Sequence, residues 1–139
     1  MKLVVDASVA LKWFLTAKPD ERDLAQAEAV AAAIERRETE LFAPCHWTAE
    51  VIAVLARVNP GVVDDALVLL DDMRPTLIHS VAVLRRAAEL SVSLDHHLFD
   101  TLYHAVALEE GATLVTADDV YFGKAKALGG IQSLADFVV

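Results

Sequence analysis

Lys2-Leu3-Val4-Val5 is a short run of strand-forming residues that ends at an acid, Asp6. Its apolar residues follow one another without alternation, which is typical of a strand covered on both faces. Strands of this kind belong to parallel sheets with helices on each side. The segment 7–15 that follows has helical character, with Asp6 or Ser8 near its start. The N-terminus therefore predicts the first strand and helix of an α/β protein.

The alternation of strand and helix continues along the whole chain. We expect further strands at 40–43, 76–79 and 112–115, and a short edge strand at 131. We expect helices at 7–15, from an N-cap at Asp20 toward Glu38, at 46–58, 62–73, 81–90 and 98–110, from 118 toward 129, and as a last turn within 133–139, with connections at 16–19 and 91–97. The pattern predicts a three-layer α/β/α sandwich around a central parallel sheet of four to five strands.

Composition narrows the class of protein. The 139 residues are 55% hydrophobic and 24% charged, which excludes intrinsic disorder. The longest apolar runs, such as Val51–Ala56, span six residues and are too short to cross a membrane. No signal-peptide core follows Met1 either, so we expect a cytoplasmic protein.

Cys45 is the single cysteine; we expect no disulfide and a small buried side chain. A net charge of −9 disfavours nonspecific nucleic-acid binding through a broad basic surface.

Two acids follow predicted strands. Asp6 comes directly after the first strand and Asp118 follows the strand at 112–115. In an open parallel sheet, ligands bind at the carboxyl ends of the strands. A helix also follows each acid, and Asp is a favoured N-cap residue, so a capping role is the simpler interpretation of each one taken singly.

Two further acids lie on predicted helices. Glu50 falls at the margin of the apolar stripe of the helix at 46–58, where a boundary residue that reaches water is the alternative. Asp100 lies in the first turn of a helix that is apolar nearly all round. A carboxylate there needs a cation, a hydrogen-bond donor or the helix N-terminus, and His104 is a candidate donor.

All four acids lie near the starts of helices, so a parallel sheet is expected to bring them to one edge. Convergent carboxylates without a cysteine cluster suit a hard cation such as Mg²⁺ or Mn²⁺. Such ions bind phosphate oxygens and activate water for phosphodiester hydrolysis.

Four segments in this order resemble the PIN-domain family, and most closely the single-domain toxins of VapBC-type toxin–antitoxin systems. They are Val4-Val5-Asp6-Ala7-Ser8, Thr48-Ala49-Glu50-Val51, Phe99-Asp100-Thr101-Leu102-Tyr103-His104-Ala105-Val106-Ala107 and Leu114-Val115-Thr116-Ala117-Asp118. The resemblance extends to the ending Ser133-Leu134-Ala135-Asp136-Phe137, so residues 1–139 are expected to form a single PIN-like domain.

The resemblance implies a Mg²⁺- or Mn²⁺-dependent ribonuclease, a homodimer and inhibition by a small antitoxin protein. Asp6, Glu50, Asp100 and Asp118 match the acidic quartet of the family, and Ser8 and Thr116 match hydroxyl positions that support it. Asp119 is either an outer ligand or, as we favour, a helix-start acid. Phe99 stands where the family often has Tyr.

Other features carry weaker expectations. Lys124 and Lys126 are candidates for holding RNA phosphates, and the pair His96-His97 is expected to lie in a polar loop rather than to bind metal. Core or dimer packing is the favoured role of Trp47, and base stacking is the alternative. The alternative functions are a catalytically inactive PIN-like binding module and a haloacid-type phosphohydrolase with Asp6 as nucleophile. The latter chemistry wants a second acid two residues on, where this chain has Ser8.

Overall fold

The computed structural model describes residues 1–15 and 22–138. Its five strands are β1 (Lys2–Val5), β2 (Glu40–Pro44), β3 (Thr76–Ile78), β4 (Thr113–Thr116) and β5 (Ile131–Ser133). Its α-helices are α1 (Ala7–Ala10), α2 (Leu24–Glu35), α3 (Trp47–Val58), α4 (Val63–Asp72), α5 (Val81–Leu94), α6 (Leu98–Glu110) and α7 (Asp119–Ala125), and short 3₁₀ turns lie at Leu11–Trp13, Pro60–Val62, Lys126–Leu128 and Leu134–Asp136. The expected connection at 16–19 and the expected cap at Asp20 lie outside the described residues.

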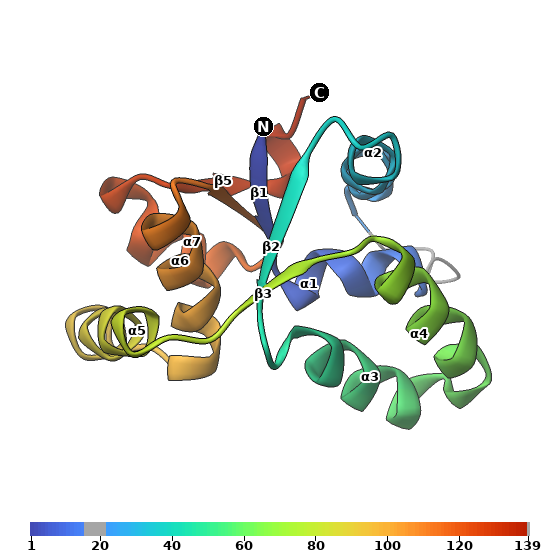
Figure 1. The fold of residues 1–139 in the computed structure, drawn as a ribbon, viewed down its shortest axis with the longest axis horizontal. Coiled ribbons are helices and arrows are strands. Elements are labelled where there is room, and N and C mark those ends of the chain that lie inside the picture. Colours follow the sequence, from blue (N-terminus) through green and yellow to red (C-terminus); the bar gives the residue numbers. More distant parts are fainter. Residues whose placement is uncertain (16–21, 139) are drawn as a thin grey trace.

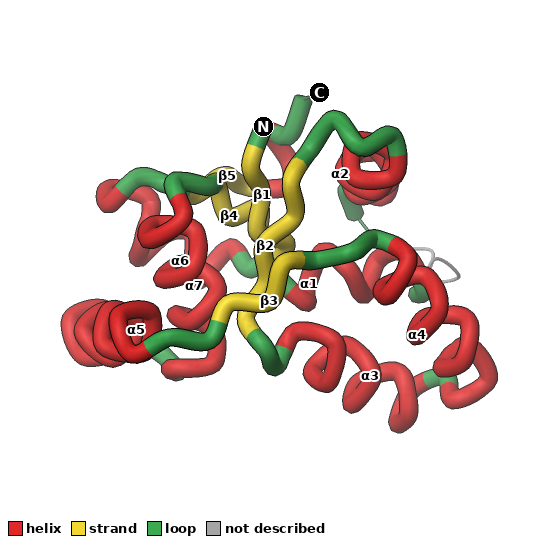
Figure 2. The backbone as a smooth tube through the Cα atoms, viewed as in Figure 1, coloured by secondary structure: helices red, strands yellow, loops and turns green. Residues whose placement is uncertain are grey.

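The strands form one sheet in the order β3-β2-β1-β4-β5, and every neighbouring pair is parallel. From β1 the chain proceeds through β2 to β3 at one edge and then returns to β4 and β5 on the other side of β1. Right-handed crossovers that run in opposite directions place their helices on opposite faces of a sheet. Accordingly α1 to α4 lie on one face and α5 to α7 on the other (Figures 1 and 2). The predicted α/β/α sandwich with a parallel sheet is confirmed.

Helix α6 lies at the centre of its layer. It packs directly on β1, β2 and β4, and α5 packs on its outer side. Residues 101–107 are consequently all buried. This arrangement explains why the sequence of α6 is apolar nearly all round, since one side meets the sheet and the other meets a helix.

Helix ends account for most differences from the sequence prediction. Helix α5 continues to Leu94, so the expected connection 91–97 shrinks to a few residues that begin at Asp95, in the left-handed region with φ 49°. Ser91 and Ser93 lie in the last turn of this helix, where their side chains are at least partly exposed. Their polarity therefore does not indicate a loop. The expected helix 7–15 is a short α1 followed by a 3₁₀ turn. Gly130 closes the turn before β5, where a Cβ atom would lie 2.9 Å from Cδ2 of Leu108.

No helix in residues 1–15 or 22–138 has the length and apolar character needed to span a bilayer. Trp47 is fully buried, in agreement with the core role expected for it. Cys45 is exposed, so the expectation of a buried thiol is wrong; it follows the last residue of β2, where the chain leaves the sheet, and its Sγ lies 3.9 Å from the carbonyl oxygen of Ile78.

Candidate metal centre at the carboxyl edge of the sheet

The candidate site lies where the strand order reverses. Strand β1 is paired with β2 on one side and with β4 on the other, and the chain leaves these neighbours toward opposite faces. In open α/β sheets, ligands bind beyond the carboxyl ends of the strands at such a switch point, which here are the ends of β1 and β4. Asp6 is the first residue after β1, and Asp118 is the second residue after β4. The fold thus brings together two acids that are 112 positions apart in the sequence.

Hydroxyl groups connect these two strand ends. Thr116 Oγ1 donates a hydrogen bond to Asp6 Oδ2 at 2.7 Å and accepts one from the backbone N–H of Asp118 at 3.0 Å. Ser8 Oγ accepts a hydrogen bond from the backbone N–H of Ala117 at 3.1 Å. The backbone N–H of Ser8 donates to Asp6 Oδ1 at 3.3 Å, which caps α1. Thr116 and Ser8, the two hydroxyl residues named from the sequence, therefore hold the backbone at these strand ends and the carboxylate of Asp6.

Asp6 is buried, with 8% of its surface exposed. Burial raises the pKa of its carboxyl group to about 6 from an ordinary 3.8, against the lowering effect of the hydrogen bonds from Thr116 and Ser8. The negative charges of Asp100 and Glu50 raise this pKa further. Since such electrostatic effects require proximity, the acids on α3 and α6 lie near the acid that follows β1.

Glu50 is held by two aromatic residues. Tyr103 donates its hydroxyl hydrogen to Glu50 Oε2 at 3.0 Å, and His46 Nε2 lies 3.1 Å from the same oxygen. The Tyr103 ring is fully buried in α6, and burial together with the charges of Glu50, Asp6 and Asp100 raises the pKa of its hydroxyl. Glu50 therefore lies on the side of α3 that meets the site, although its side chain remains 32% exposed.

Asp100 and Asp118 lie beside each other, together with a histidine. One potential ligand atom from each of His96, Asp100 and Asp118 lies within 4.8 Å of the others. His96 Nε2 is 2.9 Å from Asp100 Oδ2. Asp118 Oδ1 accepts a hydrogen bond from the backbone N–H of Tyr121 at 3.0 Å and so caps α7. The capping interpretation and proximity to the acid cluster both hold for Asp118, as they do for Asp6.

The prediction that His104 donates a hydrogen bond to Asp100 is wrong. His104 is fully buried, with Nδ1 2.9 Å from the Tyr121 hydroxyl and Nε2 2.8 Å from the carbonyl oxygen of Gly129. One helical turn separates Asp100 from His104, but Asp100 lies at the open end of α6 whereas His104 is in its enclosed middle. The observed partner, His96, lies four residues before Asp100. The same i,i+4 spacing joins His46 to Glu50. The spacing alone does not single out His96, because His104 lies equally far from Asp100 in the sequence.

The remaining candidates lie at the margin. Asp119 forms an exposed ion pair with Arg22 at 3.0 Å, in agreement with a helix-start acid. Lys124 Nζ donates to the carbonyl oxygen of Asp95 at 2.8 Å and lies 3.3 Å from His96 Nδ1. Lys126 is exposed in the 3₁₀ turn after α7.

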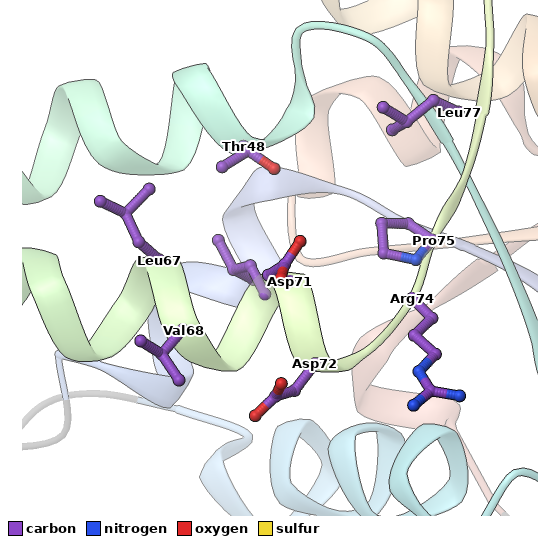
Figure 3. Close-up of a pocket in the computed structure, with 9 residues that line it drawn as sticks. Thr48, Leu67, Val68, Asp71, Asp72, Arg74, Pro75 and Leu77 are labelled. Carbon is purple, nitrogen blue, oxygen red and sulfur yellow. The ribbon is translucent and has the colours of Figure 1, made fainter.

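The donor set fits a small divalent cation. Four carboxylates are the oxygen ligands that Mg²⁺ and Mn²⁺ prefer, and a buried carboxylate whose pKa is raised by neighbouring acids is stabilised by a positive charge. Elsewhere, a pocket of about 770 Å³ lies between the start of α3, the helix α4 and the segment that leads into β3 (Figure 3). Thr48, Leu67 and Val68 are among its lining residues, and it includes none of the four acids.

Comparisons with known proteins agree with this architecture. The family model of the PIN domain matches residues 3–128. No curated protein matches the chain.

Solved structures similar to this chain share its fold at low sequence identity. PAE2754 from Pyrobaculum aerophilum has 20% identity and a TM-score of 0.66 over 97% of this chain and 85% of that one. VapBC2 from Rickettsia felis, bound to a DNA fragment from its promoter, has 15% identity and a TM-score of 0.65 over 96% and 98%. VapBC-1 from nontypeable Haemophilus influenzae has 16% identity and a TM-score of 0.65 over 98% and 100%.

Proposed function

The chain belongs to the PIN domain family, and on this premise we propose that it is a Mg²⁺- or Mn²⁺-dependent endoribonuclease, the toxin component of a VapBC-type toxin–antitoxin system. PIN domains are generally nucleases and typically use divalent metals. Two observations support the proposal: Asp100 lies beside Asp118, and the charges of Asp100 and Glu50 act on Asp6, which follows the central strand of a parallel sheet.

In this proposal the four carboxylates hold the metal. A bound Mg²⁺ or Mn²⁺ supplies a water molecule of lowered pKa and neutralises charge on the phosphodiester. The chain contributes preorganisation. Thr116 and Ser8 fix the orientation of Asp6, and Tyr103 and His46 fix Glu50, so that binding of the cation needs little rearrangement.

The charge of the chain bears on how an RNA substrate would be recognised. A net charge of −9 disfavours nonspecific binding through a broad basic surface, which supports local recognition, with RNA phosphate oxygens meeting the site itself. Lys126, in the 3₁₀ turn after α7, is the better candidate to meet phosphates flanking the scissile bond, because Lys124 is engaged with Asp95 and His96.

The decisive experiment measures cleavage of a mixed-sequence RNA with Mg²⁺, Mn²⁺ or EDTA. We expect divalent-cation-dependent endonucleolytic products, and a loss of at least about 100-fold in Asp6→Asn and Asp100→Asn, because each change removes a charged ligand without removing bulk. Asp119→Asn is the matched control, since this acid is committed to an exposed pair with Arg22. Cleavage that survives both substitutions, or that persists in EDTA, contradicts the proposal. Metal binding without cleavage indicates an inactive binding module instead.

The proposed biological setting has its own test. A toxin of this type is expected to form a homodimer and to be inhibited by a small antitoxin encoded beside it. Co-expression with the short reading frame directly upstream should yield a complex that co-purifies and lacks ribonuclease activity, with its stoichiometry read from mass measurement. Independent purification of the two chains, with no effect of one on the other, contradicts this assignment while leaving the nuclease chemistry intact.

A further inference from the structure

A line of polar contacts reaches the candidate metal centre from outside the acidic quartet. Lys124 on α7 lies 3.3 Å from His96 Nδ1, and His96 Nε2 lies 2.9 Å from Asp100 Oδ2. His96 itself belongs to the short connection between α5 and α6. The line therefore joins three elements at one carboxylate.

The chemistry of lysine determines how the histidine is protonated. An ammonium group carries only hydrogen-bond donors, so the ring nitrogen that faces it must present a lone pair. In a neutral imidazole the single proton then lies on the other nitrogen. In that tautomer the Nε2–H of His96 is the group that faces Asp100 Oδ2, 2.9 Å away, and can donate a hydrogen bond to it. A nitrogen that carries this proton has no lone pair to offer a metal ion.

The surroundings hold both ends of this line in place. The His96 side chain is only 10% exposed, and its ring packs edge-on against the buried Tyr121 ring with centroids 4.9 Å apart. Lys124 Nζ also donates to the carbonyl oxygen of Asp95, at the C-cap of α5, at 2.8 Å. The lysine is therefore committed to the end of α5 as well as to the ring.

We propose that His96 is a positioning residue for Asp100 and that Lys124 selects its tautomer. The Nε2–H group fixes Oδ2 and so leaves Oδ1 of the same carboxylate to face the cation and Asp118. Hydrogen bonds of this kind to metal ligands typically change metal affinity by about 10- to 100-fold. The metal-binding part of this inference rests on the proposed function, whereas the tautomer does not.

The tautomer is measured directly in the metal-free protein. Long-range ¹H–¹⁵N correlation spectra of the histidine rings distinguish an Nε2–H from an Nδ1–H imidazole. We expect His96 in the Nε2–H form at pH 8, a shift toward a mixture in Lys124→Met, and no change in Lys126→Met, the matched lysine of the next turn. An Nδ1–H ring in the wild-type protein, or an unchanged ring in Lys124→Met, overturns the inference.

Metal affinity tests the consequence. We expect the Kd for Mn²⁺, from the electron paramagnetic resonance signal of the free ion, to rise about 10- to 100-fold in His96→Ala. His96→Gln should remain within about threefold of the wild type, because a glutamine amide offers a donor at nearly the same reach. His97→Ala, the exposed neighbour, is the control for disturbance of the loop. A glutamine variant as weak as the alanine variant, or an unaffected alanine variant, overturns the inference.

The spin echo of bound Mn²⁺ separates positioning from ligation. A directly bonded imidazole nitrogen modulates the echo, so nitrogen modulation that disappears in His96→Ala makes His96 a ligand and overturns the inference. The two proposals also fail separately. If His96→Ala binds Mn²⁺ more weakly than the wild type but the wild type cleaves no RNA, the positioning role is supported and the nuclease function is contradicted. Absence of Mn²⁺ binding in the wild type overturns the nuclease and the metal-binding part of this inference together.

Discussion

Asp6 is an acid whose environment favours its protonated form. Its folded pKa of about 6 exceeds the ordinary 3.8, so between these values the folded chain binds more protons than the unfolded chain. The resulting stabilisation is fully present below about pH 4 and is lost as the pH rises through 6. The shift corresponds to about 3 kcal/mol. Asp6→Asn lacks this titration, so without divalent ions its stability relative to the wild type should rise by about 3 kcal/mol from pH 4 to pH 8.

Urea unfolding of both proteins in EDTA, at several pH values, measures this difference. Asp119→Asn is the control, because an exposed carboxylate paired with Arg22 lacks the burial that raises the pKa of Asp6. A difference between Asp6→Asn and the wild type that stays flat across the range contradicts a self-repelling, buried carboxylate at this position.

Single residues also mark where sequence reasoning succeeded and where it stopped. Asp6, Glu50, Asp100 and Asp118 were selected as candidates because strand ends, an amphipathic margin and an acid in an apolar helix are local signals, and their role as metal ligands stays a prediction. The histidine partners of Glu50 and Asp100 were not predicted, because a partner depends on side-chain direction. His104 was the candidate donor to Asp100 because it lies one helical turn further along the chain, whereas the enclosure of His104 between α5 and the sheet is a tertiary fact.

At the level of elements, Asp118 serves α7 and the candidate site with the same side chain. Its Oδ1 accepts the backbone N–H of Tyr121, and Asn caps helices about as well as Asp. We therefore expect Asp118→Asn to keep the wild-type stability of the metal-free protein, and Asp118→Ala to lose about 1 kcal/mol. Both should lose Mn²⁺ affinity and cleavage. Denaturant unfolding and Mn²⁺ titration of the pair separate the roles, and equal stability of the two variants would show that the cap contributes nothing.

Helices α6 and α7 are joined by a buried contact. His104 bonds the Tyr121 hydroxyl and the carbonyl oxygen of Gly129, so removing it leaves two polar groups without their partner. His104→Ala should cost about 3 kcal/mol and Tyr121→Phe about 1 kcal/mol. Burial lowers the pKa of His104 below 6.5, so its contribution is present above that pH and is lost as the pH falls.

Unfolding at pH 7.5 and 5 checks this contact. The cost of His104→Ala should shrink at the lower pH, because the wild-type protein is then weakened by protonation of the same ring. A cost that is unchanged with pH would place the loss in packing rather than in the hydrogen bonds.

Helix boundaries were the less predictable part of these elements. The end of α6 at Gly111 and the cap of α5 at Ser80 follow from residue types with strong positional preferences. The end of α5 does not, because its last turn, residues 91–94, mixes polar and apolar residues and only the left-handed Asp95 terminates it. An αL aspartate carries no sequence signature as clear as glycine.

For the whole molecule, the order of strands is what assembles the candidate site. The sequence predicts parallel strands but not that β4 lies beside β1, and with β4 at an outer edge Asp118 would be far from Asp6. Handedness of the crossovers and the apolar character of α6, which must be covered on both sides, favour the observed order. The convergence of the acids is thus a property of topology that local patterns support only indirectly.

Because the four acids come from α3, α6 and the ends of β1 and β4, a cation that binds all of them should stabilise the entire fold. At a concentration of 100 times Kd, binding adds about 2.7 kcal/mol to the free energy of unfolding. For 139 residues this corresponds to a rise in Tm of roughly 8 °C. We expect Mn²⁺ to produce this shift in the wild type and in Asp119→Asn, and to produce little in Asp100→Asn. Differential scanning calorimetry with Mn²⁺ and with EDTA makes the comparison, and a shift that survives in Asp100→Asn would place the cation outside this edge of the sheet.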